Sequence, residues 1–225
     1  MGAGVRPHVV AQLAVSVDGA TAGFAVDHAR FYALATLWQE DVTLIGADTI
    51  LAQEEALRSA PHPGPRPAGP LLAVVDSRAR VREWEALRRV GHWSDVLALY
   101  ADQTPARSPD SSIAELITGY DRVDLAEALD LLGSRRGAEV VRVESGGTLI
   151  AVLLELGLID ELALLVHPVI VGSGGPWTTS RLNLNLSLAN AEEFEGGVVW
   201  LRYCVSLGRG AQGSSEVGES VGGDG

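Results

Sequence analysis

The stretch VRVESGGTLIAVLL, residues 141–154, joins two different apolar patterns through a pair of glycines. EVVRVE alternates as a strand does, and TLIAVLLELG repeats at helical spacing. The turn between them, Ser145-Gly146-Gly147-Thr148, leaves backbone N–H groups unpaired at the start of the helix, where no glycine Cβ blocks approach. The positive end of a helix attracts anions. We therefore predict a phosphate or pyrophosphate site here, the alternative being an ordinary tight turn.

Strand and helix patterns alternate on both sides of this stretch. Strands are predicted at residues 8–17, 42–46, 71–76, 95–101 and 139–144, and longer ones at 160–172 and 198–207; helices are predicted at 29–39, 125–136 and 148–157. This order predicts a three-layer α/β fold, with a mainly parallel central sheet, antiparallel C-terminal strands and helices on both faces. We expect one domain over residues 1–207 and a disordered tail of glycine, serine and acidic residues over 208–225.

Individual residues predict where helices begin and end. Asp27 is expected to cap the first helix, and Asp48 or Thr49 to cap a short helix after strand 42–46. The helix at 125–136 is expected to close at Gly133 or Gly137.

Composition narrows the class of protein. The formal net charge is -12 and lysine is absent, which disfavours nucleic acid and membrane surfaces as partners. The single cysteine, Cys204, lies in an apolar run and is predicted to be a buried thiol, and neither it nor the histidines have metal-ligand spacing, so no metal site is predicted. No segment is long and apolar enough to cross a bilayer and no signal peptide is evident, so we expect a cytoplasmic protein.

A second turn has the layout of the first. Gly46-Ala47-Asp48-Thr49 also follows a short strand and opens a helix, and two such turns at the carboxyl ends of strands favour a nucleotide site. Strand 71–76 is followed by Ser77, Arg78 and Arg80, whose hydroxyl and up to two guanidinium groups suit the 2′-phosphate of NADPH. The alternative is that these arginines are solvated and pair with the acidic surface.

Two carboxylates stand where predicted strands end. Asp18 follows the first strand and Glu144 ends another, so either can pass a proton to a reactive C=N bond; the alternatives are a turn aspartate and an acid at a helix start. His167, within a predicted strand, is interpreted as a buried structural histidine.

The motifs SVDG, VTLIGADTILA, VVDSR, VESGGTL and LGLIDELALLVHPVIVGSGG, in this order, resemble the riboflavin-biosynthesis reductase (RibD C-terminal domain-like) family over residues 8–207. The resemblance implies a dihydrofolate-reductase-like fold, a homodimer, and hydride transfer from NADPH to an imine-like carbon of a small heterocycle. The cofactor contacts that it implies are Ser16, Gly19, Gly46, Asp48, Thr49, Ser77, Arg78, Ser145, Gly146, Gly147, Thr148 and Leu149. Because the turn would cradle a pyrophosphate, we expect a valine at Gly147 to impair cofactor binding more than folding.

The substrate side departs from the family pattern. Leu34-Ala35-Thr36 stands where relatives carry LRA, and residues 52–58 replace a motif that contains a further arginine, so two phosphate contacts are missing. Arg30 and Arg58 are the candidate replacements, and Gly172 and Gly174 are further candidate substrate contacts. Ser145 also stands where a glycine is usual.

These departures leave the substrate open. It is either the phosphorylated ribosylaminopyrimidine of riboflavin biosynthesis or an unphosphorylated imine of specialised metabolism, with a pterin or dihydrofolate as a further option. Two non-enzymatic alternatives remain: a non-catalytic nucleotide-binding protein, and an interaction module that binds no nucleotide.

Overall fold

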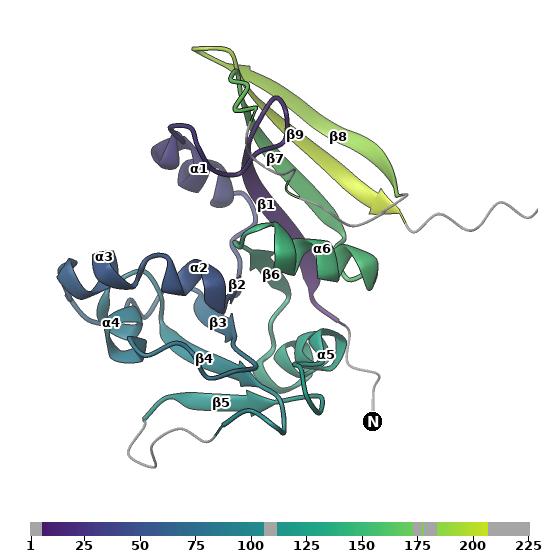
Figure 1. The fold of residues 1–225 in the computed structure, drawn as a ribbon. Helices are drawn as coiled ribbons and strands as arrows, with labels where there is room; N and C mark the ends of the chain where they lie inside the picture. The colour runs from purple at the N-terminus through teal and green to yellow at the C-terminus, as the bar shows by residue number, and fades with distance from the viewer. Residues whose placement is uncertain (1–5, 106–111, 173–176, 178–183, 207–225) are drawn as a thin grey trace, which may run out of the picture.

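A computed structural model describes residues 6–105, 112–172, 177 and 184–206, in which nine strands form one mixed sheet (Figure 1). In chain order the strands are β1 (His8–Ser16), β2 (Val42–Gly46), β3 (Leu71–Val75), β4 (Asp95–Tyr100), β5 (Ala114–Ile117), β6 (Val140–Val143), β7 (Glu161–His167), β8 (Asn185–Phe194) and β9 (Val198–Ser206). The helices are α1 (His28–Ala35), α2 (Ala47–Leu51), α3 (Glu54–Ser59), α4 (Trp84–Arg89), α5 (Leu125–Arg136) and α6 (Gly147–Glu155).

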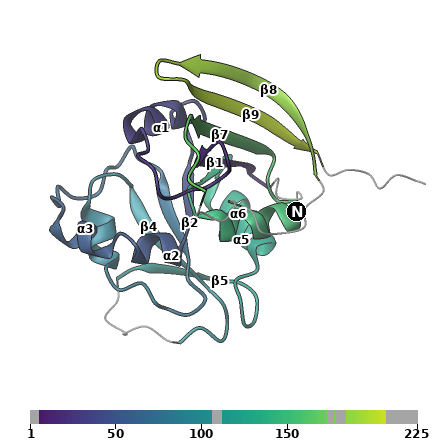
Figure 2. The ribbon, with the colours of Figure 1, turned by 45° about the horizontal axis from the view of Figure 1, so that its top comes forward.

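The sheet has the order β5-β4-β3-β2-β6-β1-β7-β9-β8. Every pair from β5 to β7 is parallel, whereas β9 runs antiparallel to both β7 and β8. In both views the β8–β9 hairpin lies at the end of the sheet opposite β5 (Figures 1 and 2). The predicted combination of a mainly parallel sheet with antiparallel C-terminal strands is confirmed.

Helices cover both faces of the sheet, because alternate strand residues point to opposite sides. On one face, α5 and α6 bury Leu129 and Leu153 against Val9 and Val143. On the other face, α2, α3 and α4 pack over β2, β3 and β4 in one apolar cluster, and α1 packs over β7 and β9 in another. The predicted three-layer arrangement is thus confirmed.

The observed helix ends correct three details. Asp27 caps α1 by accepting from the Arg30 N–H, as predicted, but α1 ends at Ala35 rather than near residue 39. Neither Asp48 nor Thr49 caps α2, because its N-cap is Gly46. Gly137, with φ of 70°, closes α5, so the alternative stop at Gly133 is wrong.

Several helices and strands were not predicted, and one strand is shorter than predicted. The strands β5 and β8 and the helices α3 and α4 were not predicted. The strand expected over 160–172 ends at His167, since Pro168 cannot donate to a sheet. The prediction that Cys204 is buried is wrong, because this residue is exposed on β9. The tail expected over 208–225 lies outside the described residues, and no helix among those described is long and apolar enough to span a membrane.

Candidate functional site

The topology of the sheet indicates a ligand-binding crevice at its carboxyl edge, at the end of β6. This strand lies between β2 and β1, and its following helix, α6, packs on the face that also carries α5. The connections after β2 and β1 lead instead to α2 and α1 on the opposite face. Adjacent connections that leave a parallel sheet on opposite faces open a crevice between them, and ligands bind in such crevices.

The two glycine-containing turns meet at this crevice. The Gly46 N–H donates to Ser145 Oγ at 3.1 Å, and the Gly146 N–H donates to Thr49 Oγ1 at 3.3 Å. The hydroxyl oxygens of Thr49 and Ser145 lie 3.3 Å apart. Two turns that are about one hundred residues apart in sequence therefore form one polar surface, as expected from β2 and β6 being neighbours.

The turn at residues 145–148 is open on one side only. A Cβ at Gly146 would meet nothing within 4 Å, so that glycine faces open space. A Cβ at Gly147 would clash with the backbone of Trp177, whose N–H donates to the Gly19 carbonyl at 2.9 Å. The helix α6 has no side-chain cap, Gly146 and Thr148 are exposed, and Leu149 is partly buried against the core. A phosphate can approach Gly146 and Thr148, whereas the expectation that a side chain at residue 147 would project at the cofactor is wrong.

The turn after β3 is held in place by hydrogen bonds to two other segments of the chain. The Ser77 hydroxyl accepts from the Val123 N–H at 3.1 Å, and the Ser77 carbonyl accepts from Thr104 Oγ1 at 2.9 Å. Arg78 is exposed, whereas Arg80 pairs with Asp48 of α2 at 2.7 Å. This ion pair ties the β3 turn to the β2 turn, so Arg80 has the acidic partner that the alternative interpretation of these arginines predicts.

Asp18 anchors a loop. Its carboxylate accepts from the Ser16 hydroxyl at 2.6 Å and from the N–H groups of Val171 and Gly172 at 3.1 and 2.8 Å. The Ser16 hydroxyl, and then the two backbone N–H groups, lower the pKa of Asp18 to about 2. Such a group carries no proton near neutral pH, so the interpretation of Asp18 as a proton donor does not fit this geometry.

The register of the sheet separates the two predicted acids. Ala11 on β1 pairs with Val143 on β6, so Glu144 lies level with Gln12. From Gln12 to the end of β1 at Ser16 the strand runs on for about 13 Å, and Asp18 lies in the turn that follows. Asp18 and Glu144 are therefore offset along the carboxyl edge of the sheet.

Glu144 belongs to a group of polar residues that lies between the two apolar clusters on the α1 side of the sheet. We call this group the buried polar seam; its members are Gln12, Tyr32, Glu40, Thr43, Arg142 and Glu144. Arg142 is 4% exposed and donates from Nε to Glu40 at 2.8 Å, and from Nη1 to Glu144 Oε2 at 2.9 Å and Gln12 Oε1 at 3.3 Å. The Tyr32 hydroxyl donates to Glu144 Oε1 at 2.7 Å. Sequence reasoning missed all members except Glu144.

Charge dominates this seam. Burial opposes the charged form of Arg142, but the carboxylates of Glu144 and Glu40 outweigh it and raise the pKa of Arg142 above its ordinary value. Partial burial of the Tyr32 hydroxyl, followed by the charge of Glu144, raises the pKa of Tyr32. Both residues thus keep their protons and act as donors to Glu144.

The remaining predicted site residues lie elsewhere or have other partners. Arg30 pairs with Asp27 at 3.4 Å and stacks over the Phe194 ring, and Arg58 pairs with Glu83 at 3.6 Å. Gly172 contacts Asp18, and Gly174 lies outside the described residues. His167 is buried and its Nε2 accepts from the Asp27 N–H, which confirms its structural interpretation.

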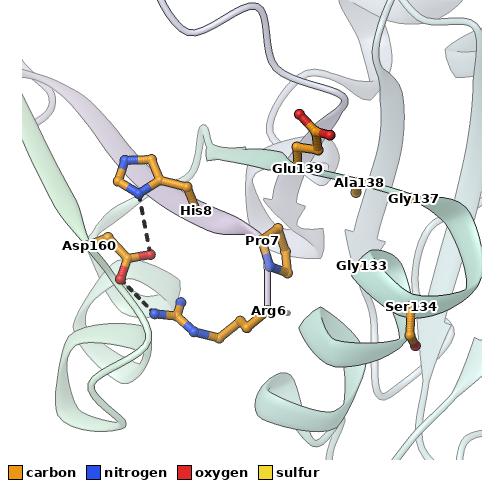
Figure 3. A pocket seen from close by; sticks show the side chains of 9 residues that line it. All are labelled: Arg6, Pro7, His8, Gly133, Ser134, Gly137, Ala138, Glu139 and Asp160. Atoms are coloured by element: carbon orange, nitrogen blue, oxygen red, sulfur yellow. Dashed lines mark hydrogen bonds and ion pairs between the residues drawn. The ribbon is translucent and has the colours of Figure 1, made fainter. Parts of the chain in front are cut away.

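A cavity of about 650 Å³ lies at the opposite, amino edge of the sheet (Figure 3). It is lined by Arg6, Pro7, His8, Gly133, Ser134, Gly137, Ala138, Glu139 and Asp160, none of which was predicted as a site residue. Arg6 and Asp160 form an ion pair of 2.6 Å within it. Among the described residues, no group of three or more His, Cys, Asp and Glu side chains is placed to hold a metal ion.

Comparison with known proteins places this chain among reductases. The sequence model of the RibD C-terminal domain matches residues 7–200. The 2,5-diamino-6-ribosylamino-4(3H)-pyrimidinone 5′-phosphate reductase of Archaeoglobus fulgidus is 27% identical over 183 residues, which is 75% of this chain and 83% of that protein.

Solved structures share the fold. RibD of Acinetobacter baumannii superposes with a TM-score of 0.68 at 19% identity, covering 89% of this chain and 58% of that one, so this chain spans little more than half of that RibD. Dihydrofolate reductase of Enterococcus faecalis superposes with a TM-score of 0.50 at 9% identity, covering 90% of this chain and 98% of that one. The predicted dihydrofolate-reductase-like fold is confirmed.

Proposed function

Because this chain belongs to the RibD C-terminal domain family, we propose that it is an NADPH-dependent reductase that delivers hydride to an imine-like carbon of a small heterocycle. The observation that carries the proposal is the junction at the end of β6, where hydrogen bonds join the turns at 46–49 and 145–148 beside Glu144. The relative from Archaeoglobus fulgidus, a reductase of a ribosylaminopyrimidine phosphate, supports the same substrate class.

In this proposal the cofactor is held at its phosphates by the Gly146 and Thr148 side of the turn, with help from the hydroxyls of Ser145 and Thr49. These hydroxyls now satisfy backbone N–H groups, and a bound phosphate would accept from the same N–H groups. When bound, NADPH supplies the hydride. We assign the adenosine end to the Ser77 and Arg78 turn, since β3 is the neighbour of β2 on that side. We assign the nicotinamide end to the space between the Ser16 to Gly19 turn and Glu144, so that its ring reaches the carbon beside Glu144.

Glu144 is the carboxylate that we place beside the reacting carbon. It follows directly after β6 and its side chain remains 22% exposed, which leaves it open to a ligand. Asp18 has a supporting role in the proposal, because it holds the loop at residues 171–172 against the end of β1.

The substrate that we favour lacks a 5′-phosphate. Both candidate replacement arginines already have partners, Arg30 on Asp27 and the Phe194 ring and Arg58 on Glu83. A charge-assisted contact contributes about 1.5 to 3 kcal/mol, so two missing contacts would weaken binding of a phosphorylated sugar by orders of magnitude.

The test is oxidation of NADPH, followed by its absorbance, with four substrates: the ribosylaminopyrimidine phosphate, its dephosphorylated form, dihydrofolate and a cyclic imine. We expect turnover of the dephosphorylated pyrimidine or of the imine, with a weaker response to the phosphate. Turnover of the phosphate alone would overturn the substrate assignment, and no turnover of any substrate would overturn the enzymatic one.

The alternative is a protein that binds NADPH without reducing anything. The observation in its favour is that Trp177 closes the Gly147 side of the turn and that hydroxyls already occupy the Gly46 and Gly146 amides. NADPH titration followed by intrinsic fluorescence separates the two functions, because only the alternative combines tight binding with no oxidation.

We also propose that the protein is a cytoplasmic homodimer. The edge strand β8 exposes Leu186 and Leu188, and an apolar edge strand with unpaired backbone groups favours pairing with another chain. Sedimentation equilibrium is expected to give twice the mass of the chain, and a monomer at all concentrations would contradict this assembly.

A further inference from the structure

The two oxygens of the Glu144 carboxylate have unequal partners. Oε2 accepts from Arg142, whose side chain is 5% exposed, and Oε1 accepts from the hydroxyl of Tyr32, a residue that is 49% exposed. One donor is therefore enclosed by the protein, whereas the other comes from the solvent-facing side of α1.

The guanidinium group of Arg142 is held in its contact with Glu144 by further hydrogen bonds. Its guanidinium is fixed by Glu40 and by Gln12, and the Gln12 amide in turn donates to the Phe31 carbonyl at 2.8 Å. Removing one partner of a buried, hydrogen-bonded charge pair is strongly destabilising. The contact at Oε2 is thus a permanent part of the fold.

The negative charge of the seam makes Oε1 of Glu144 an acceptor that needs a hydrogen-bond donor. Glu40 and Glu144 together carry two negative charges against the single positive charge of Arg142, so the seam holds one unbalanced negative charge. A carboxylate oxygen in such a place needs a hydrogen-bond donor. The Tyr32 hydroxyl supplies it in the free protein, and its single contact with Glu144 can be exchanged for another at little cost.

A second polar group in the seam lacks a partner. The Thr43 hydroxyl is buried, with 1% of the residue exposed, and it has no hydrogen-bond partner within the described part of the chain. Thr43 pairs in register with Arg142, so this hydroxyl lies on the same face of the sheet beside the guanidinium. The seam thus contains a buried polar group that the described residues leave without a hydrogen-bond partner.

We propose that Tyr32 stands in for a hydrogen-bond donor of the substrate at Glu144 Oε1, while Arg142 is the positioning residue that holds the carboxylate through Oε2. The inference rests on the proposed reductase function. It specifies the substrate class further: the ligand presents an N–H or O–H group next to the carbon that is reduced, and this group displaces the tyrosine hydroxyl. Glu144 then orients the substrate as an anionic acceptor.

The first test removes the competing hydroxyl. In Tyr32→Phe, the substrate that wild type turns over no longer has to displace a donor, so KM is expected to fall about fivefold with kcat within about twofold. Tyr120→Phe is the matched control, because Tyr120 is 67% exposed and lies after β5. A KM that rises or stays unchanged in Tyr32→Phe would overturn the inference.

The second test concerns Arg142. Arg142→Lys keeps a charge but cannot reach both Glu40 and Glu144, so kcat is expected to fall at least tenfold. Arg202→Lys is the control, since Arg202 on β9 forms an ion pair of 2.5 Å with Glu161 on β7, away from Glu144. If both variants lower Tm alike and neither changes kcat, Arg142 is merely structural.

The closing experiment observes the displacement itself. With 3-fluorotyrosine at position 32, the ¹⁹F resonance is expected to shift when the substrate is added with NADP⁺, and not with NADP⁺ alone. Turnover with an unmoved resonance would overturn this inference and leave the reductase function intact. Absence of turnover with every substrate would remove the function and, with it, the inference.

Discussion

The backbone of Trp177 fills the space beside Gly147 in which a side chain would begin. Residue 147 is therefore a glycine because another part of the chain passes against it. Its neighbour Gly146 has no such contact, and these adjacent glycines consequently give opposite predictions.

Gly147→Ala is expected to lower the free energy of unfolding by about 2 kcal/mol, because the added Cβ must push the Trp177 backbone away. Gly146→Ala is expected to change it by less than about 0.5 kcal/mol, since its φ of -63° suits any residue and the space is open. Chemical denaturation measures both values.

Cofactor affinity is expected to change in a different way from stability in these two glycine variants. Gly146→Ala is expected to weaken NADPH binding at least tenfold, because its Cβ would stand where a phosphate approaches. Fluorescence titration measures this, and an unchanged affinity in Gly146→Ala would show that the phosphates bind elsewhere.

Asp18→Asn is expected to lower Tm near neutral pH and to have no effect near pH 2. The folded state lowers the pKa of Asp18 from 3.8 to about 2, so the carboxylate stabilises the fold above about pH 4 and this stabilisation is lost as the pH falls toward 2. Thermal denaturation between pH 2 and 7 measures the difference between the two proteins. A constant difference over this range would contradict the assigned hydrogen bonds.

Gly137→Ala is expected to destabilise the protein by about 1 kcal/mol through the backbone alone, because φ is 70° and a Cβ would meet nothing within 4 Å. Asparagine tolerates this conformation better, so Gly137→Asn is the control and is expected to cost less. Equal losses in the two variants would point to a steric cause instead.

Cys204 is expected to react with a thiol reagent in the native protein, giving about one modified thiol per chain without denaturant. This residue is exposed on β9, and it is the single cysteine of the sequence. A reaction that requires unfolding would mean that another chain or segment covers β9.

The fold was predictable where burial imposes a pattern. The strand VTLIG was predicted with its observed bounds, because a parallel strand buried on both faces reads as a continuous apolar run. By contrast β8 is largely exposed on both faces and has no such pattern; it is a strand because β9 pairs with it. Sequence periodicity carries no information about such a strand.

The site was predictable only in part, for a related reason. The turns at 46–49 and 145–148 were predicted because in each one glycine residues stand close to the end of an apolar strand. The polar seam joins β1, α1, β2 and β6, and no local pattern connects these segments. One signal was present, however: Arg142 interrupts the buried strand VVRV, and a charge in such a position requires a buried partner.

The position of β6 in the sheet also determines the order in which the chain can fold during synthesis. Among the described strands, β1 pairs with β6 and β7, which leave the ribosome more than 120 residues later than β1 does. Until then the first strand has no edge to join, and the nascent chain must keep HVVAQLAVS from associating wrongly. Pairing of β1 therefore waits for β6, whose arrival fills the place between β1 and β2 in the sheet.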